Sequence, residues 1–123
     1  MPHIVFSPAA EQDILSILTW TEEQFGEQER IRYEALLLRA ILDIAEMPER
    51  AGTNQRPEIT QVARTYHLLH SRDRVAKKVG RVHKPRHFLL FRIRQDGTVE
   101  IGRVLHDSVD LARHLPEEYR AGT

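Results

Sequence analysis

Apolar residues recur every three or four positions between residues 8 and 47, and this spacing predicts two amphipathic helices. The first is expected to begin at Ser7-Pro8, because serine accepts a hydrogen bond from a free helix amide and proline suits the first helical turn. Gly26 is expected to end it, and Pro48 to stop a second helix over residues 27–47. The apolar seam of the second helix comprises Ile31, Ala35, Leu38, Leu42 and Ala45, widened by Leu37, Ile41 and Ile44. These two segments predict a helical hairpin.

The remaining apolar segments are short and rich in β-prone residues, which predicts strands. They cover residues 3–6, 65–70, 87–94 and 98–105. The third segment carries apolar residues on both faces, so it is expected at the centre of a sheet. Asp96-Gly97 is a tight-turn signal that predicts an antiparallel pairing between the third and fourth segments.

The connections complete the expected architecture. Residues 48–63 have the composition of a loop, and a short helix is expected over residues 110–114. Residues 71–86 are polar and basic and are expected to form an extended hairpin arm or a mobile loop. The element order β-α-α-β-β-β predicts an α+β fold, an antiparallel β-sheet with the helical hairpin packed on one face and a short C-terminal helix. A length of 123 residues fits one domain over residues 1–123.

Composition excludes several classes of protein. The chain contains no cysteine, so it has no disulfide framework and no thiolate site. The N-terminus does not resemble a signal peptide, and no apolar run approaches the roughly 20 residues that span a bilayer. These features predict a cytoplasmic protein without membrane contact. The seven histidines show no dependable metal spacing, so neither a metal site nor a cofactor is expected.

Charge is distributed unevenly along the chain although the net charge is zero. Residues 64–94 hold 10 basic residues and one acidic residue, whereas residues 1–63 hold 5 basic and 11 acidic ones. This segregation predicts a surface for an anionic partner, and the alternative is that the basic block pairs with the acidic helices of the same chain. The cations expected to contact a target or partner are Arg72, Arg74, Lys77, Lys78, Arg81, Lys84, Arg86, Arg92, Arg94 and Arg103.

Four segments resemble the RelE/ParE superfamily of toxins, in particular its ParE or plasmid-stabilisation branch. They are residues 6–14, residues 21–26, residues 87–93, and residues 96–106 with the following 110–115. Their order and spacing carry the resemblance over nearly the whole chain. The basic stretch over residues 72–86 is longer than the usual connection in that superfamily.

The resemblance implies the toxin half of a type II toxin–antitoxin pair. It implies a cognate antitoxin, of ribbon-helix-helix type, whose disordered C-terminal tail orders as it wraps the toxin in a hetero-oligomer. It also implies one of two activities. Some members cut mRNA on the ribosome, and others bind and poison DNA gyrase without being enzymes.

The candidate catalytic residues for RNA cleavage are Arg92, Arg103 and His106, because arginine can clamp a phosphate and histidine can move protons near neutral pH. Each also has a structural alternative. For Arg92 it is to face a partner carboxylate, for Arg103 to pair with Glu100, Asp107 or Asp110, and for His106 to fix the turn after the last strand. The neutral overall charge favours the gyrase-binding class, because ribosome-directed nucleases gain affinity from a strongly basic surface. A ribosome-dependent endoribonuclease and a non-toxic interaction module of the same fold are the alternatives.

Overall fold

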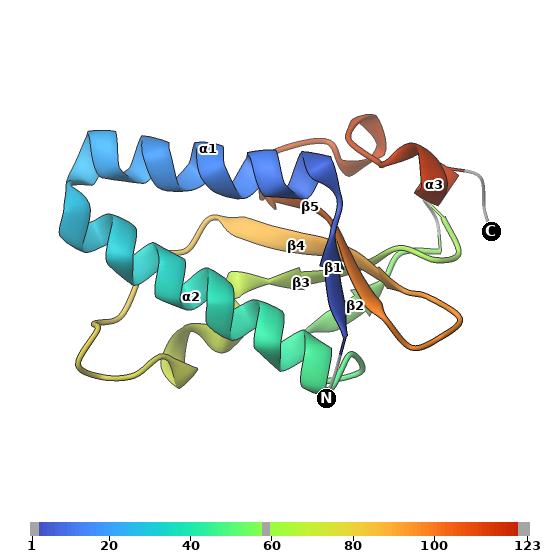
Figure 1. The fold of residues 1–123 in the computed structure, drawn as a ribbon, viewed down its shortest axis with the longest axis horizontal. Coiled ribbons are helices and arrows are strands. Elements are labelled where there is room, and N and C mark those ends of the chain that lie inside the picture. Colours follow the sequence, from blue (N-terminus) through green and yellow to red (C-terminus); the bar gives the residue numbers. More distant parts are fainter. Residues whose placement is uncertain (1–2, 58–59, 121–123) are drawn as a thin grey trace.

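The computed structural model of the chain describes residues 3–57 and 60–120. Its helices and strands are β1 (Ile4–Phe6), α1 (Pro8–Phe25), α2 (Glu27–Glu46), β2 (Thr53–Gln55), β3 (Arg64–His67), the 3₁₀ helix η1 (Leu68–Arg74), β4 (His87–Ile93), β5 (Val99–His106), the 3₁₀ helix η2 (Leu111–Arg113) and α3 (Glu117–Arg120). The fold is α+β, as predicted, with α1 and α2 lying across one face of the sheet (Figure 1).

The sheet has five strands in the order β1-β5-β4-β3-β2, and the predicted central strand β4 lies in its middle. Strands β2 to β5 pair antiparallel, but β1 runs parallel to β5, so the sheet is mixed and not purely antiparallel. The parallel direction places the start of α1 over β5. There the Ser7 amide donates to the Ile101 carbonyl at 3.0 Å and the Ser7 hydroxyl donates to the Gly102 carbonyl at 2.6 Å.

The predicted helix boundaries are confirmed by their caps. The Ser7 hydroxyl accepts from the Ala10 amide at 3.0 Å, and Gly26 ends α1 with a φ of 94°. The expected apolar face of α2 is wrong at Leu38, which is 57% exposed, but Leu37, Ile41, Ile44 and Ala45 are buried as expected. The buried face of α2 carries Tyr33, Leu36, Leu37, Ala40, Ile41, Asp43, Ile44 and Ala45. This face includes a tyrosine and an aspartate, which a count of apolar residues does not register.

Three connections differ from expectation. β2 forms within residues 48–63, which were expected to be loop, and pairs with β3. The strand expected over residues 65–70 ends at His67, whose side chain caps η1 by accepting from the Leu69 amide at 3.0 Å. The basic residues 71–86 are not an extended arm: their first part belongs to η1, and two valines, Val75 and Val82, pack against the core.

The sheet has a hydrophobic cluster on each face. The larger cluster lies between the helices and the sheet and includes Leu89, Phe91 and Ile101. The smaller one lies under the C-terminal segment and includes Leu90 and Tyr119. A side chain at Gly102 would meet the hydroxyl of Tyr119 at 2.8 Å, so glycine lets the C-terminal segment lie against β5.

Asp43 on α2 is fully buried and ties α2 to η1. Its carboxylate accepts from the Ser71 hydroxyl at 2.6 Å, from Arg74 Nε at 3.0 Å and from Arg39 Nε at 3.0 Å. Burial alone would raise the pKa of Asp43, but these hydrogen bonds and positive charges outweigh it and hold the pKa below its usual value. The carboxylate is therefore ionised and satisfied inside the fold.

We expect Asp43→Asn to lower the free energy of unfolding by about 3 kcal/mol, because the buried hydrogen-bond acceptor loses its charge while its arginine partners keep theirs. Urea unfolding at pH 7 measures this loss. The wild type should also lose stability more steeply than the variant once the pH falls through the lowered pKa of Asp43, since protonation removes the same charge.

Asp73→Asn is the matched control, because Asp73 pairs with Arg81 at 3.1 Å in an exposed position. It should change stability by no more than about 0.5 kcal/mol. Equal effects of the two substitutions would contradict a structural role specific to Asp43.

Candidate functional site

A cleft of about 610 Å³ opens where the α1–α2 junction meets the start of β4 and the end of β5. We call it the aromatic cleft. It is lined by Trp20, Thr21, Phe25, Glu29, Arg32, Tyr33, Gly80, Arg81, Val82, His83, Lys84, Arg86, His87 and His106. The lining comes from both helices, from the segment before β4 and from two paired strands, so the fold as a whole builds the cleft.

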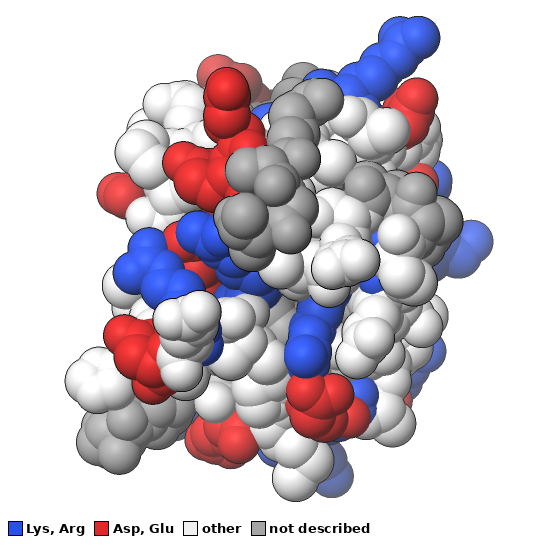
Figure 2. Space-filling view, turned by 90° about the vertical axis from the view of Figure 1, so that its right-hand side faces the viewer, with Lys and Arg blue, Asp and Glu red and all other residues white. Residues whose placement is uncertain are grey.

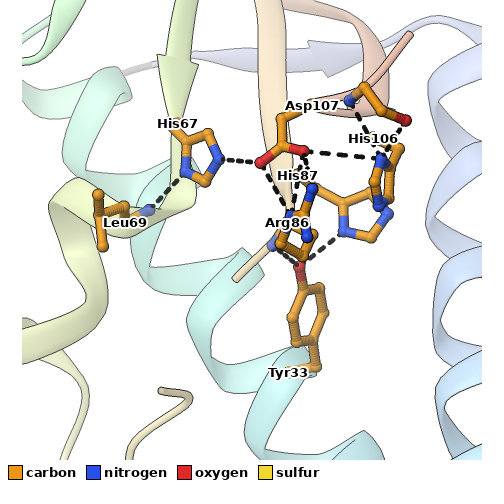
Figure 3. Close-up of polar contacts among 8 residues, drawn as sticks. Tyr33, His67, Leu69, Arg86, His87, His106 and Asp107 are labelled. Atoms are coloured by element: carbon orange, nitrogen blue, oxygen red, sulfur yellow. Dashed lines mark hydrogen bonds and ion pairs between the residues drawn. The ribbon is translucent and has the colours of Figure 1, made fainter. Parts of the chain in front are cut away.

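Tyr33 and His87 form a partly buried hydrogen-bonded pair at one side of the cleft (Figure 3). The Tyr33 hydroxyl accepts from the Arg86 amide at 3.1 Å and lies 2.6 Å from Nδ1 of His87. Burial raises the pKa of Tyr33 to about 12, so the hydroxyl keeps its proton and donates it to His87. Burial, and then the neighbouring His106, lower the pKa of His87 to about 4. His87 is therefore a neutral imidazole with its hydrogen on Nε2.

Asp107 is the centre of a second hydrogen-bonded group of residues beside the cleft (Figure 3). Arg86 donates to Asp107 through Nε at 3.1 Å and Nη2 at 2.9 Å, and Nε2 of His67 lies 3.0 Å from the other oxygen. Hydrogen bonds from Arg86 and then His67 lower the pKa of Asp107 to about 2. This network joins the ends of β3, β4 and β5.

His106 lies opposite His87 in the β4–β5 pairing, with the ring centroids 5.3 Å apart. Its Nδ1 accepts from the Ser108 amide at 3.1 Å and contacts the Ser108 hydroxyl at 2.7 Å. His106 thus fixes the turn after the last strand while its ring lines the aromatic cleft.

The three candidate catalytic residues do not come together. Arg92 points to the opposite face of β4 from His87, where it pairs with buried Glu100 at 3.1 Å and lies over the Tyr119 ring. Arg103 pairs with Asp13 on α1 through two hydrogen bonds of 2.7 and 2.9 Å. The expected partners of Arg103 were Glu100, Asp107 or Asp110, so that expectation is wrong. A bulge at this point of β5 turns the chain, and the Val104 amide also donates to Asp13.

Most of the cations expected at a binding surface have intramolecular partners. Arg74 pairs with Asp43, Arg81 with Asp73, Arg86 with Asp107, Arg92 and Arg94 with Glu100, and Arg103 with Asp13, while Arg72 donates to the His83 carbonyl. Within residues 3–57 and 60–120, the three lysines Lys77, Lys78 and Lys84 have no ion pair or hydrogen bond. On the face seen in Figure 2, basic and acidic side chains lie beside one another and do not form a field of one sign.

Sequence reasoning missed Tyr33, His67, His87 and Asp107 as members of one site. The predicted hairpin places His87 and His106 close together on neighbouring strands, and the register shift between Leu90 and Phe91 then brings them directly opposite each other. The position of Tyr33 carries no comparable signal, since it depends on how α2 is rotated against the sheet.

In the part of the chain that the structure describes, no group of three histidine, aspartate or glutamate side chains could hold a metal ion. No helix among the same residues is long and apolar enough to cross a membrane.

A helical hairpin packed on one face of a β-sheet is the architecture that the resemblance to the RelE/ParE toxins implies, and the structure has it on a mixed five-stranded sheet. The family model described as the ParE toxin of the type II toxin-antitoxin system, parDE, matches residues 4–111, and the chain belongs to this family. It is thus a toxin-family protein with a cognate antitoxin as its implied partner. No curated protein matches the chain.

We expect the free energy of unfolding to fall as the pH drops from 6.5 towards 4, because the unfolded chain protonates His87 in this window and the native chain does not. Above pH 6.5 the free energy of unfolding keeps its full value with respect to His87. Below pH 6.5 it decreases progressively, by roughly 2 to 3 kcal/mol in all. Urea unfolding across this pH range, with His87→Gln as the comparison, isolates the effect. A His87 resonance that titrates near its usual pKa in NMR would contradict the assignment.

Proposed function

We propose that this toxin acts by binding and poisoning DNA gyrase, and that it does not cut RNA. The observation that carries the proposal is the separation of Arg92, Arg103 and His106 into three places, with the two arginines held by Glu100 and Asp13. The resemblance to the RelE/ParE toxins implies two classes of activity, and this separation favours the class that is not enzymatic.

Catalysis by these arginines would require that they leave their carboxylate partners. Stabilising a scissile phosphate requires guanidinium groups aimed at the developing charge. Arg92 and Arg103 each make two hydrogen bonds to a carboxylate that is buried or nearly so. Withdrawing Arg92 would leave buried Glu100 with Arg94 as its remaining partner. Withdrawing Arg103 would leave partly buried Asp13 with only the Val104 amide, so either movement removes compensation from a carboxylate that the fold shields from water. Binding a target through its surface requires no such rearrangement.

A ribosome-dependent ribonuclease is the second candidate, and one observation favours it. His87, His106, Tyr33 and Lys84 all line the same cleft, and a nuclease needs proton-transfer groups and a cation together. Against it, Nδ1 of each histidine is already engaged, and Tyr33 keeps its proton because burial raises its pKa to about 12.

To decide between the two activities, purified toxin is added in parallel to DNA gyrase and to translating ribosomes. We expect inhibition of supercoiling or trapping of cleaved DNA, intact ribosome-bound mRNA, and recovery of gyrase when the cognate antitoxin is added first. Codon-phased cuts in mRNA would replace the proposal with the second candidate. Harmless expression together with an unaffected gyrase would show that the chain is a non-toxic interaction module.

The unpaired lysines supply a second prediction. We propose that Lys77 and Lys78 contribute to target encounter, because they are exposed and no acidic partner neutralises them among the described residues. Replacing both with glutamine should weaken gyrase inhibition about tenfold at low salt and reduce its dependence on salt, since exposed charges chiefly speed association. Thermal unfolding should be unchanged. Unaltered inhibition would show that the two lysines are merely solvated.

A further inference from the structure

The walls of the aromatic cleft carry large side chains that the fold leaves uncovered. Trp20 is 53% exposed and Phe25 is 62% exposed, and their rings meet edge to face with centroids 5.6 Å apart. Val82 and Tyr33 line the same cleft. Apolar side chains grouped beside a cavity are typical of a surface that another molecule covers. The cleft therefore has room and apolar contact area for a bulky apolar side chain.

Two hydrogen-bond donors without partners lie beside these walls. An imidazole that accepts a hydrogen bond at Nδ1 carries its hydrogen on Nε2. His87 accepts at Nδ1 from Tyr33, and His106 accepts at Nδ1 from the Ser108 amide. Within residues 3–57 and 60–120, neither Nε2 has a hydrogen-bond partner. The two rings meet edge to face with their centroids 5.3 Å apart, so both imidazoles lie at the same place in the cleft wall.

The charge around the cleft limits what that acceptor can be. Its three arginines are compensated, because Arg32 pairs with Glu29, Arg81 with Asp73 and Arg86 with Asp107. Lys84 alone among the basic residues of the lining has no acidic partner in the described residues. One lysine matches one negative charge, whereas a nucleic-acid backbone would bring a phosphate with every nucleotide.

We propose that the aromatic cleft is a docking site for a peptide segment of the antitoxin that presents one bulky apolar side chain next to one carboxylate. The apolar side chain lies against Trp20 and Phe25, and the carboxylate accepts from His87 and His106 and pairs with Lys84. The proposal rests on membership of the toxin family and is independent of whether gyrase is the target.

A fragment that contains only these two features tests the chemistry. The probe is 3-(4-fluorophenyl)propionate, whose ¹⁹F NMR line should broaden saturably in the presence of the full-length toxin. The neutral amide of the same fragment should bind at least about tenfold more weakly, because it has no charge for Lys84. Adding one equivalent of the cognate antitoxin should restore the sharp line of the free fragment.

Two variants locate the site, and a third controls for charge. Lys84→Met keeps the aliphatic stem without the charge, and His106→Asn keeps an acceptor for the Ser108 amide without the Nε2 donor. Each of these two substitutions should lower the affinity of the toxin for the fragment, and for the antitoxin, about tenfold. Arg113→Met removes an exposed charge outside the cleft lining and should change either affinity less than about twofold. If His106→Asn unfolds, Lys84→Met alone carries the test.

The results of these experiments distinguish the antitoxin from other molecules that could occupy the aromatic cleft. A fragment that binds but stays bound when the antitoxin is added would overturn the antitoxin as occupant. Displacement of the fragment by a single-stranded oligonucleotide, and not by the antitoxin, would mean that the cleft binds nucleic acid. No binding of the fragment at millimolar concentration would overturn the site itself. A toxin that fails to inhibit gyrase but passes these tests would contradict only the proposed target.

Discussion

Glu100 lies buried in the β4–β5 hairpin with two arginines, Arg92 and Arg94, on its carboxylate. A buried carboxylate is tolerated only where positive partners and hydrogen bonds replace water, so the position of Glu100 dictates where these arginines lie. Asp43 between α2 and η1 and Asp13 between α1 and β5 impose the same condition. Together these carboxylates hold four of the ten cations on which the binding surface was predicted, namely Arg74, Arg92, Arg94 and Arg103.

Elements with local signals were predictable from sequence, and elements that depend on distant contacts were not. Ser7 and Gly26 mark the ends of α1 through their own chemistry, and Asp96-Gly97 marks the β4–β5 turn. The parallel direction of β1 and the existence of β2 have no such signal, because three-residue strands owe their pairing to neighbours far along the chain. The same holds for charge, since a basic segment in sequence does not reveal which acidic side chains lie opposite it.

The candidate functional site also has a part that the sequence predicts and a part that depends on distant contacts. Arg92, Arg103 and His106 were candidates because of their residue types and their places on strands, yet the alternation of strand faces and a bulge send them to different surroundings. The aromatic cleft instead assembles residues from both helices and both central strands. The two kinds of residue therefore have different roles. Arginines pair with carboxylates inside the fold and stabilise it, while aromatic rings, imidazoles and lysines are available to contact partners. This division is consistent with a toxin that works by occupying surfaces.

That division is tested most directly by the Nε–H signals of Arg92, Arg94 and Arg103 in NMR spectra of the free toxin and of the toxin bound to its antitoxin. Guanidiniums held by internal carboxylates should give slowly exchanging signals that keep their positions when the partner binds. Loss or a strong shift of these signals in the complex would mean that the arginines leave Glu100 and Asp13 to contact the partner, which would contradict their structural role.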